Sequence, residues 1–133
     1  MAFNVSQTKR DRVSEEKGSW MPYDADCAFL VARNNNSEYS KFISKCLRDN
    51  DSNKDVDEGA LTGAQLLEGA ARFLLVGWRG VFDGKKELPY SFEAAKALLD
   101  EHDDLYREIA VYATARSNYL LKRDNKDVKN LKK

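Results

Sequence analysis

The sequence has few of the residues on which catalytic and metal sites depend. It contains one histidine, two cysteines and two prolines in 133 residues, and its 22 basic residues balance its 22 acidic ones. A single histidine excludes the paired Cys and His spacings of zinc sites. The zero net charge gives the whole chain no bias towards nucleic acid or membrane surfaces. No apolar run approaches the ~18 residues of a membrane-spanning helix, so we expect no membrane partner.

The sequence motifs of common enzymes are missing as well. No glycine pattern of a phosphate-binding or dinucleotide-binding loop occurs, and Ser91 lacks the Gly-x-Ser-x-Gly setting of a hydrolase nucleophile. The single histidine, His102, is flanked by Glu101 and Asp103, which favours a surface loop over a catalytic role. We therefore expect no enzymatic activity, no catalytic residue and no cofactor.

The acidic segment 49–59 is the best candidate for a metal site. Read as a calcium loop that begins at Asp49, it has Lys54 where the loop needs Gly and Ala60 where it needs a bidentate Glu. A start at Asp51 fails at the same two positions of the loop. We interpret the segment as a solvated linker without a metal.

The two cysteines lie in apolar stretches. Cys27 falls in a strand-like run, and Cys46 falls on the apolar face of a predicted helix. The first residues lack the apolar core of a secretory signal. We therefore expect reduced, buried thiols in a cytoplasmic protein rather than a disulfide.

What the chain does contain is apolar periodicity, which predicts a mainly helical α+β fold. Aromatic and β-branched residues on both sides of Asp24–Asp26 predict a short N-terminal β-hairpin. The turn signal Asp83-Gly84 predicts a second small ribbon near 79–90. Apolar spacing and capping residues predict about four helices, over roughly 37–48, 62–76, 92–100 and 103–123.

Individual residues set the ends of these elements. The predicted helix N-caps are Ser37, Thr62 and Ser91. Gln65 completes a capping box with Thr62, and Gly77 is expected to end the second helix. Pro22 cannot donate to a ladder, so the first strand should be short or lie at an edge of its sheet.

Both ends of the chain differ from its middle. Residues 1–17 are charged and poor in apolar side chains, so we interpret them as a flexible arm before a single globular domain over 18–123. Residues 124–133 form a basic tail, and the last twelve positions hold six basic and two acidic residues, a net +4. Without aromatics between the cations, a solvated end is favoured over nucleic-acid binding.

Five aromatic residues are candidates for a partner-binding surface, because Trp and Tyr are favoured anchors in protein interfaces. The alternative for each is a place in the core. The five residues are Trp20, Tyr23, Trp78, Phe82 and Tyr90.

The segment that follows the second predicted helix resembles tail assembly chaperones of long-tailed bacteriophages. The resemblance rests on a Trp, a Val, an Asp-Gly turn, a Pro-aromatic-Ser and a helix that ends in Leu-Leu before an acidic residue. The matching positions are Trp78, Val81, Asp83-Gly84, Pro89-Tyr90-Ser91, Glu93, Leu98-Leu99 and Asp100. The hairpin that leads into Val31-Ala32-Arg33, the Asn-rich loop and Tyr39 is also similar, and the resemblance covers roughly residues 18–129.

The resemblance implies a function in the infected cell. Such chaperones bind the long tape measure protein, keep it soluble and pass it to polymerising tail tube subunits. They are expected in the host cytoplasm and not in the mature virion. Homo-oligomers and a longer, frameshifted product are also implied by the resemblance. Two other readings stay open: a structural tail or head-completion component, and a small nucleic-acid-binding phage regulator.

Overall fold

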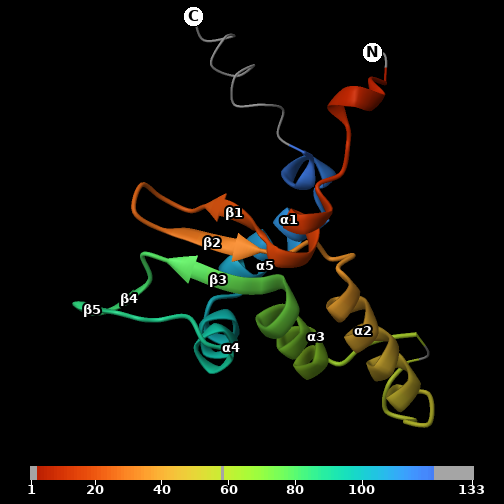
Figure 1. Cartoon of the computed structure of the whole chain (residues 1–133). Coiled ribbons are helices and arrows are strands. Elements are labelled where there is room, and N and C mark those ends of the chain that lie inside the picture. The colour runs from red at the N-terminus through yellow and green to blue at the C-terminus, as the bar shows by residue number, and fades with distance from the viewer. Residues whose placement is uncertain (1–2, 58, 122–133) are drawn as a thin grey trace, which may run out of the picture.

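A three-stranded antiparallel sheet lies at the centre of the fold (Figure 1). The structure is a computed structural model that describes residues 3–57 and 59–121. The strands are β1 (Ser19–Pro22), β2 (Ala28–Val31) and β3 (Leu75–Arg79), in the order β1-β2-β3. The predicted hairpin is confirmed as β1 and β2, and Pro22 is the last residue of a short edge strand.

Helices make up most of the remaining structure, so the mainly helical α+β prediction is confirmed. They are α1 (Arg12–Lys17), α2 (Ser37–Asn50), α3 (Gly63–Gly69), α4 (Phe92–Glu101) and α5 (Asp103–Thr114). A π-helical turn (Ala70–Leu74) continues α3, and 3-10 turns lie at Val5–Gln7 and Arg116–Tyr119. No described helix has both the length and the apolar character needed to span a membrane.

Two of the predicted caps are confirmed and one is wrong. The Thr62 hydroxyl accepts from the Gln65 amide at 3.1 Å, and Ser91 caps α4 through the Ala94 amide at 3.0 Å. At α2, however, the cap is Asn36, whose side-chain oxygen accepts from the Tyr39 amide at 2.9 Å. The Asn36 side-chain NH2 group also donates to the carbonyls of Arg33 and Phe73. A serine hydroxyl has only one hydrogen to donate, so it could not make both of these bonds while it capped the helix.

The second predicted helix is shorter than expected. Its helical part stops at Leu74, and Leu75 begins β3 instead of continuing to Gly77. Leu75 pairs with Val31 of β2 and is fully buried. A short apolar run has no periodicity that separates a helix from a strand, and here pairing with a distant strand decides the outcome.

The last predicted helix also ends early. It stops at Thr114 rather than continuing to 123, and the chain turns through Arg116–Tyr119. Tyr119 is fully buried, and its hydroxyl donates to the Val31 carbonyl at 2.9 Å. The turn therefore brings the end of the described chain back onto β2. The predicted basic tail, 124–133, lies outside the described residues.

The N-terminal segment differs from the flexible arm that its charge suggested. Residues 12–17 form α1, which Asp11 caps by accepting from the Val13 and Ser14 amides. Arg10 forms an isolated antiparallel bridge with Leu120. The segment from about residue 9 is thus attached to the body of the fold.

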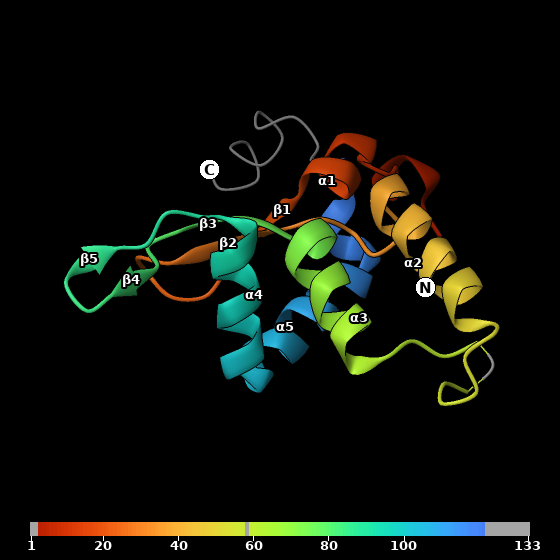
Figure 2. The same cartoon turned by 90° about the horizontal axis from the view of Figure 1, so that it is seen from below.

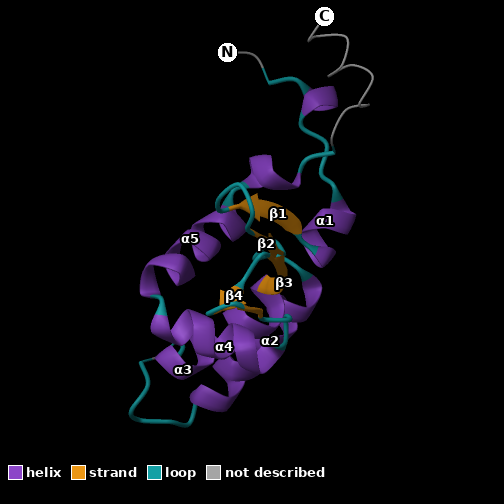
Figure 3. Cartoon of the chain, turned by 90° about the vertical axis from the view of Figure 1, so that its left-hand side faces the viewer, coloured by secondary structure: helices purple, strands orange, loops and turns teal. Residues whose placement is uncertain are grey.

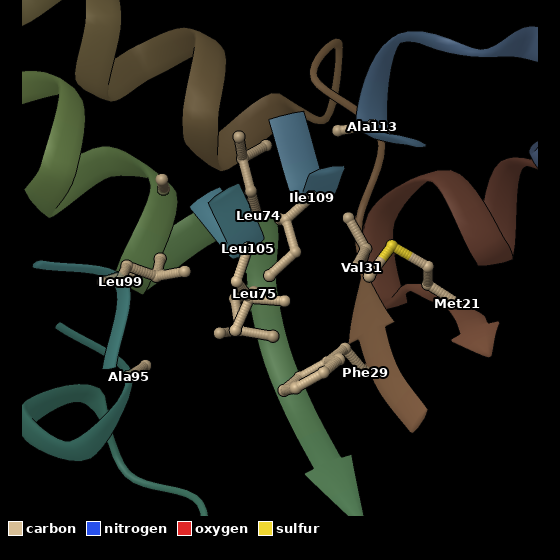
Figure 4. Close-up of a cluster of buried hydrophobic side chains, with 12 residues drawn as sticks. Met21, Phe29, Val31, Leu74, Leu75, Ala95, Leu99, Leu105, Ile109 and Ala113 are labelled. Carbon is tan, nitrogen blue, oxygen red and sulfur yellow. The ribbon is translucent and has the colours of Figure 1, made fainter. Parts of the chain in front are cut away.

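The hydrophobic core lies between the sheet and the helices α4 and α5 (Figure 4). It joins Met21, Phe29 and Val31 of the hairpin to residues of the helices and β3, namely Leu74, Leu75, Ala95, Leu99, Leu105, Ile109 and Ala113. Figure 3 shows α5 on one side of the sheet and the short α1 on the other. We call the sheet face that is turned away from α5 the outer face.

The second predicted ribbon is confirmed. Strands β4 (Phe82–Asp83) and β5 (Lys86–Glu87) pair antiparallel around a two-residue turn. Figures 1 and 2 both show this ribbon extending from the body at the side opposite α2. It is the most protruding described element near the sheet.

Candidate partner-binding surface

Trp20 and Trp78, the two candidate aromatic residues that belong to the three-stranded sheet, lie on its opposite faces. Directly opposed residues of antiparallel strands share a face, and neighbours along a strand alternate. Phe29 is paired with the buried Met21 and with Trp78, so this row faces the core. Trp20 pairs with Leu30, which therefore lies with it on the outer face.

On the core side, aromatic rings form a continuous edge-to-face series. Tyr23 contacts Phe29 with ring centres 5.7 Å apart, Phe29 contacts Trp78 at 6.4 Å, and Trp78 contacts Tyr90 at 5.1 Å. The Trp78 indole N–H donates to the Leu88 carbonyl at 2.8 Å. Trp78 and Tyr90 thus hold the chain on both sides of the ribbon, while Tyr23 keeps 56% of its surface exposed.

The outer face presents an exposed Trp with an arginine stacked on it. Trp20 is 43% exposed, and the guanidinium carbon of Arg79 lies 4.7 Å from the centre of its ring. Leu30 and Val76 are half-buried beside them. Val76 belongs to this face because a Cβ added at Gly18 would meet both Leu30 and Val76 side chains. Gly18, at the end of α1, thus covers part of Leu30 and Val76, and the exposed part of this face is Trp20 with the stacked Arg79.

The ribbon adds a second exposed aromatic residue, Phe82, which is 57% exposed. Gly80 fixes the start of the ribbon, since its φ is +72° and a Cβ there would lie 1.8 Å from the Asp26 carbonyl oxygen. Val81 packs against the core, so alternation places Phe82 on the opposite side of the chain. Phe82 and Tyr23 are therefore the most exposed of the five candidates, and Trp20 is the candidate that lies on the outer face of the sheet.

A tyrosine hydroxyl donates to one carbonyl on each edge strand of the sheet. Tyr112 donates to the Trp20 carbonyl of β1 at 3.0 Å, and Tyr90 donates to the Leu75 carbonyl of β3 at 2.7 Å. Pro22 has no N–H to offer at the β1 edge. One backbone carbonyl on each edge strand is therefore already hydrogen-bonded to a side chain.

A pocket of about 570 Å³ lies between the hairpin turn and the α4–α5 junction. Its lining includes Cys27, His102 and several carboxylates, among them Asp24. Burial, and then the charge of Asp24, raises the pKa of the Cys27 thiol, which is the opposite of what a reactive thiolate needs. Across the described ranges, no group of three or more His, Cys, Asp or Glu is placed to hold a metal ion.

Comparison with known proteins gives the chain a family. The family model described as YdaY prophage protein matches residues 34–130, which is more than half of the chain. The chain belongs to the YdaY prophage protein family. It is therefore a phage-derived protein. No curated protein and no solved structure matches it.

The region matched by the YdaY family model contains three of the five candidate aromatic residues. It includes Trp78, Phe82 and Tyr90, whereas Trp20 and Tyr23 precede its first residue. The outer face of this YdaY-family protein is thus built from Trp20 before the matched region and Arg79 within it.

Sequence reasoning missed three residues of the outer face, Leu30, Val76 and Arg79. Leu30 lies on the predicted hairpin strand, but its neighbours Val76 and Arg79 belong to a segment that the sequence pattern predicts as the end of a helix, whereas the structure has β3 there. Reading Leu-Val-Gly-Trp-Arg as a strand would have put Trp78 and Arg79 on opposite faces.

Proposed function

We propose that this YdaY-family protein is a phage tail assembly chaperone. It binds the tape measure protein in the host cytoplasm, keeps it soluble and delivers it to tail tube subunits. Its prophage family is consistent with this role. The residues from Trp78 to Asp100 that resemble tail assembly chaperones support it further.

The observation that carries the proposal is the exposed pair Trp20 and Phe82. A protein that holds a partner soluble needs exposed apolar surface, which folded monomers otherwise keep small. Aromatic side chains supply large contact area for such binding. The proposal needs no catalytic group, and it assigns none.

The test replaces both exposed aromatics with serine, in the double variant Trp20→Ser/Phe82→Ser. We expect the tape measure protein of the same prophage to co-purify with the wild-type chain, and the double variant to retain it at least about tenfold less, because two anchors at more than ~1 kcal/mol each are lost. The matched control is Val111→Ser, since Val111 is 67% exposed but lies on α5, away from the outer face. Circular dichroism and thermal unfolding establish that each variant is folded.

The possible results test the binding site at Trp20 and Phe82 separately from the chaperone function. Undiminished co-purification by a folded double variant removes the surface from the proposal. A wild-type chain that never retains the tape measure protein contradicts the chaperone role itself. Mass spectrometry of purified virions adds a second criterion, because a chaperone is absent from the particle and a structural tail component is present.

A further inference from the structure

A shallow apolar groove of about 510 Å³ lies along α5, beside the edge strand β1. Its apolar lining consists of Met21 of β1 together with Val111, Tyr112 and Ala115. Val111 keeps 67% of its surface exposed, so the described residues leave the groove open. Removal of apolar surface from water is favourable, and a segment that covered this groove would therefore be held by it.

The described chain ends close to this groove. Asn118 lines the groove, and its side-chain NH2 group donates to the Tyr112 carbonyl at 3.0 Å. Leu121 follows three positions later, where its backbone amide donates to the Lys9 carbonyl. The sequence continues from there for twelve residues, 122–133. This last segment therefore begins only a few residues away from the groove.

The last segment is long enough to reach the whole groove. An extended chain covers up to ~3.3 Å per residue, so the seven residues from 122 to 128 can span about 23 Å. Helix α5 has twelve residues, and it is therefore about 18 Å long at ~1.5 Å per residue. The two apolar residues of the last segment, Val128 and Leu131, can both reach the groove while the described fold stays as it is.

The charges of the last segment and of the remaining chain are opposite. Residues 122–133 hold six basic and two acidic residues, which leaves 16 basic and 20 acidic residues, a net −4, in residues 1–121. At the groove itself, Glu108 belongs to the lining, and Arg107 lies 3.5 Å from the carboxylate of Asp104. A basic segment that carries two apolar side chains therefore matches an apolar groove with carboxylates at one end.

We propose that residues 122–133 fold back along α5 and cover this groove, with Val128 and Leu131 on its apolar lining and the basic residues around them near Glu108 and Asp104. The segment is then an intramolecular cover for the most apolar part of the exposed α5 surface. The inference goes beyond the chaperone function and does not depend on it.

The N-terminal arm is a competing occupant, since Phe3 and Val5 are each 70% exposed. Two contacts hold this arm elsewhere. The Arg116 guanidinium stacks over the ring of Phe3, with 5.6 Å between its carbon and the ring centre. Val5 begins a 3-10 turn that the side chain of Asn4 caps through the Ser6 amide. The arm is thus engaged outside the groove.

The acidic linker 49–59 is a competing site for a basic segment. Its hollow is smaller, at about 300 Å³, and includes Asp51 and Asp57 in its lining. Figures 1 and 3 both show the loop after α2 at the end of the molecule opposite the turn Arg116–Tyr119. The groove along α5 is therefore the nearer site for a segment that starts at residue 122.

The experiment records NOE spectra of the full chain with isotope-labelled valine and leucine methyl groups. We expect cross peaks between the methyl groups of Val111 and those of Val128 or Leu131, because docking brings these side chains into contact. In the double variant Val128→Ser/Leu131→Ser, the methyl signals of Val111 shift because its cover is lost. The matched control Asn125→Ser/Asn130→Ser changes two polar residues of the same segment and leaves the Val111 signals in place.

Two further measurements accompany the variants. Val13 on α1 is an internal reference, because it is also 67% exposed, and its methyl signals should be the same in every variant. Salt should weaken the cross peaks between Val111 and the last segment by at least about twofold between ~0.1 M and ~1 M NaCl, because the Debye length falls from ~10 Å to ~3 Å.

Four results overturn the inference. The first is a wild-type spectrum without cross peaks from Val111 to Val128 or Leu131. The second is cross peaks that connect these two residues to Val56 of the acidic linker, or Val111 to Phe3. The third is cross peaks that vanish on dilution, which would assign the contact to a second copy. The fourth is full intensity at high salt, which would remove the charge complementarity. None of these measurements involves the tape measure protein, so the proposed function stands or fails separately.

Discussion

Glu15 links the N-terminal segment to the rest of the fold. It is 3% exposed and lies 2.6 Å from Arg10 Nη2 and 2.5 Å from Arg33 Nη1. Chiefly through its hydrogen bond from Arg10, this pairing lowers the pKa of Glu15. The backbone amide of Arg33 also donates to the Glu15 carbonyl at 2.9 Å. A buried carboxylate held by two arginines attaches α1 to the end of β2.

Glu15→Gln should therefore destabilise the protein. A neutral amide cannot compensate both guanidinium groups, and Arg33 is left partly buried without its counter-ion. We expect a loss of about 2–3 kcal/mol in the free energy of unfolding at pH 7, measured by urea denaturation. Glu108→Gln is the matched control, because Glu108 is an exposed glutamate of α5 and its replacement should change stability by less than about 0.5 kcal/mol.

The difference between wild type and Glu15→Gln should depend on pH. The folded pKa of Glu15 is lowered, so the stabilisation is fully present above the ordinary glutamate pKa of about 4.3. It is lost as the pH falls through the lower, folded value. Urea midpoints of the two proteins should converge under acid conditions. A difference that persisted unchanged at low pH would show that the ionised carboxylate is not its source.

At the scale of elements, the sequence correctly predicted the helix caps and turns that depend only on neighbouring residues, such as the Thr62 cap and the β4–β5 ribbon. The capping box at Thr62 needs only residues within one helical turn, and the ribbon needs only its turn sequence. Strand β3 could not be found in this way, because its identity depends on pairing with β2, more than forty positions earlier in the chain. The stacked Arg79 of the candidate surface was missed for the same reason. The position of Trp20 on an exposed face followed once the strands were paired.

Gly80 joins β3 to the ribbon and permits no side chain. Gly80→Ala would place a Cβ 1.8 Å from the Asp26 carbonyl oxygen at a φ of +72°, so backbone of the hairpin turn must move. We expect a loss of about 3 kcal/mol or more in unfolding free energy. Gly84→Ala separates the two causes, since Gly84 has a φ of +64° but no atom within 4 Å. That variant should lose only about 1 kcal/mol, from the backbone conformation alone.

Thermal and urea unfolding of the two glycine variants measure the difference. Equal losses would mean that the close approach to Asp26 contributes nothing and that the ribbon is positioned by other contacts. The indole hydrogen bond from Trp78 to Leu88 would then be the leading candidate for that role.

At the scale of the whole molecule, the fold depends on residues outside the family match. The matched region begins at residue 34, yet two of the three strands and the core residues Met21, Phe29 and Val31 precede it. The two ends of the described chain also pair with each other. The backbone amide of Asp11 donates to the Tyr119 carbonyl at 2.7 Å, and the backbone amide of Leu121 donates to the Lys9 carbonyl at 2.8 Å. The N-terminal segment thus completes the domain instead of preceding it.

Two truncations test this view of the N-terminal segment. Removal of residues 1–17 deletes Glu15 and the backbone partners of Tyr119 and Leu121, so Arg33 loses its counter-ion and the fully buried Tyr119 loses its cover. We expect the midpoint of thermal unfolding to fall by more than about 10 °C, since each kcal/mol lost shifts a domain of this size by a few degrees. Removal of residues 1–8 deletes only exposed or half-exposed positions among those described and should shift the midpoint by less than about 3 °C. A flexible arm predicts the same small shift for both truncations, so a large difference between them would establish that α1 and the segment before it belong to the folded domain.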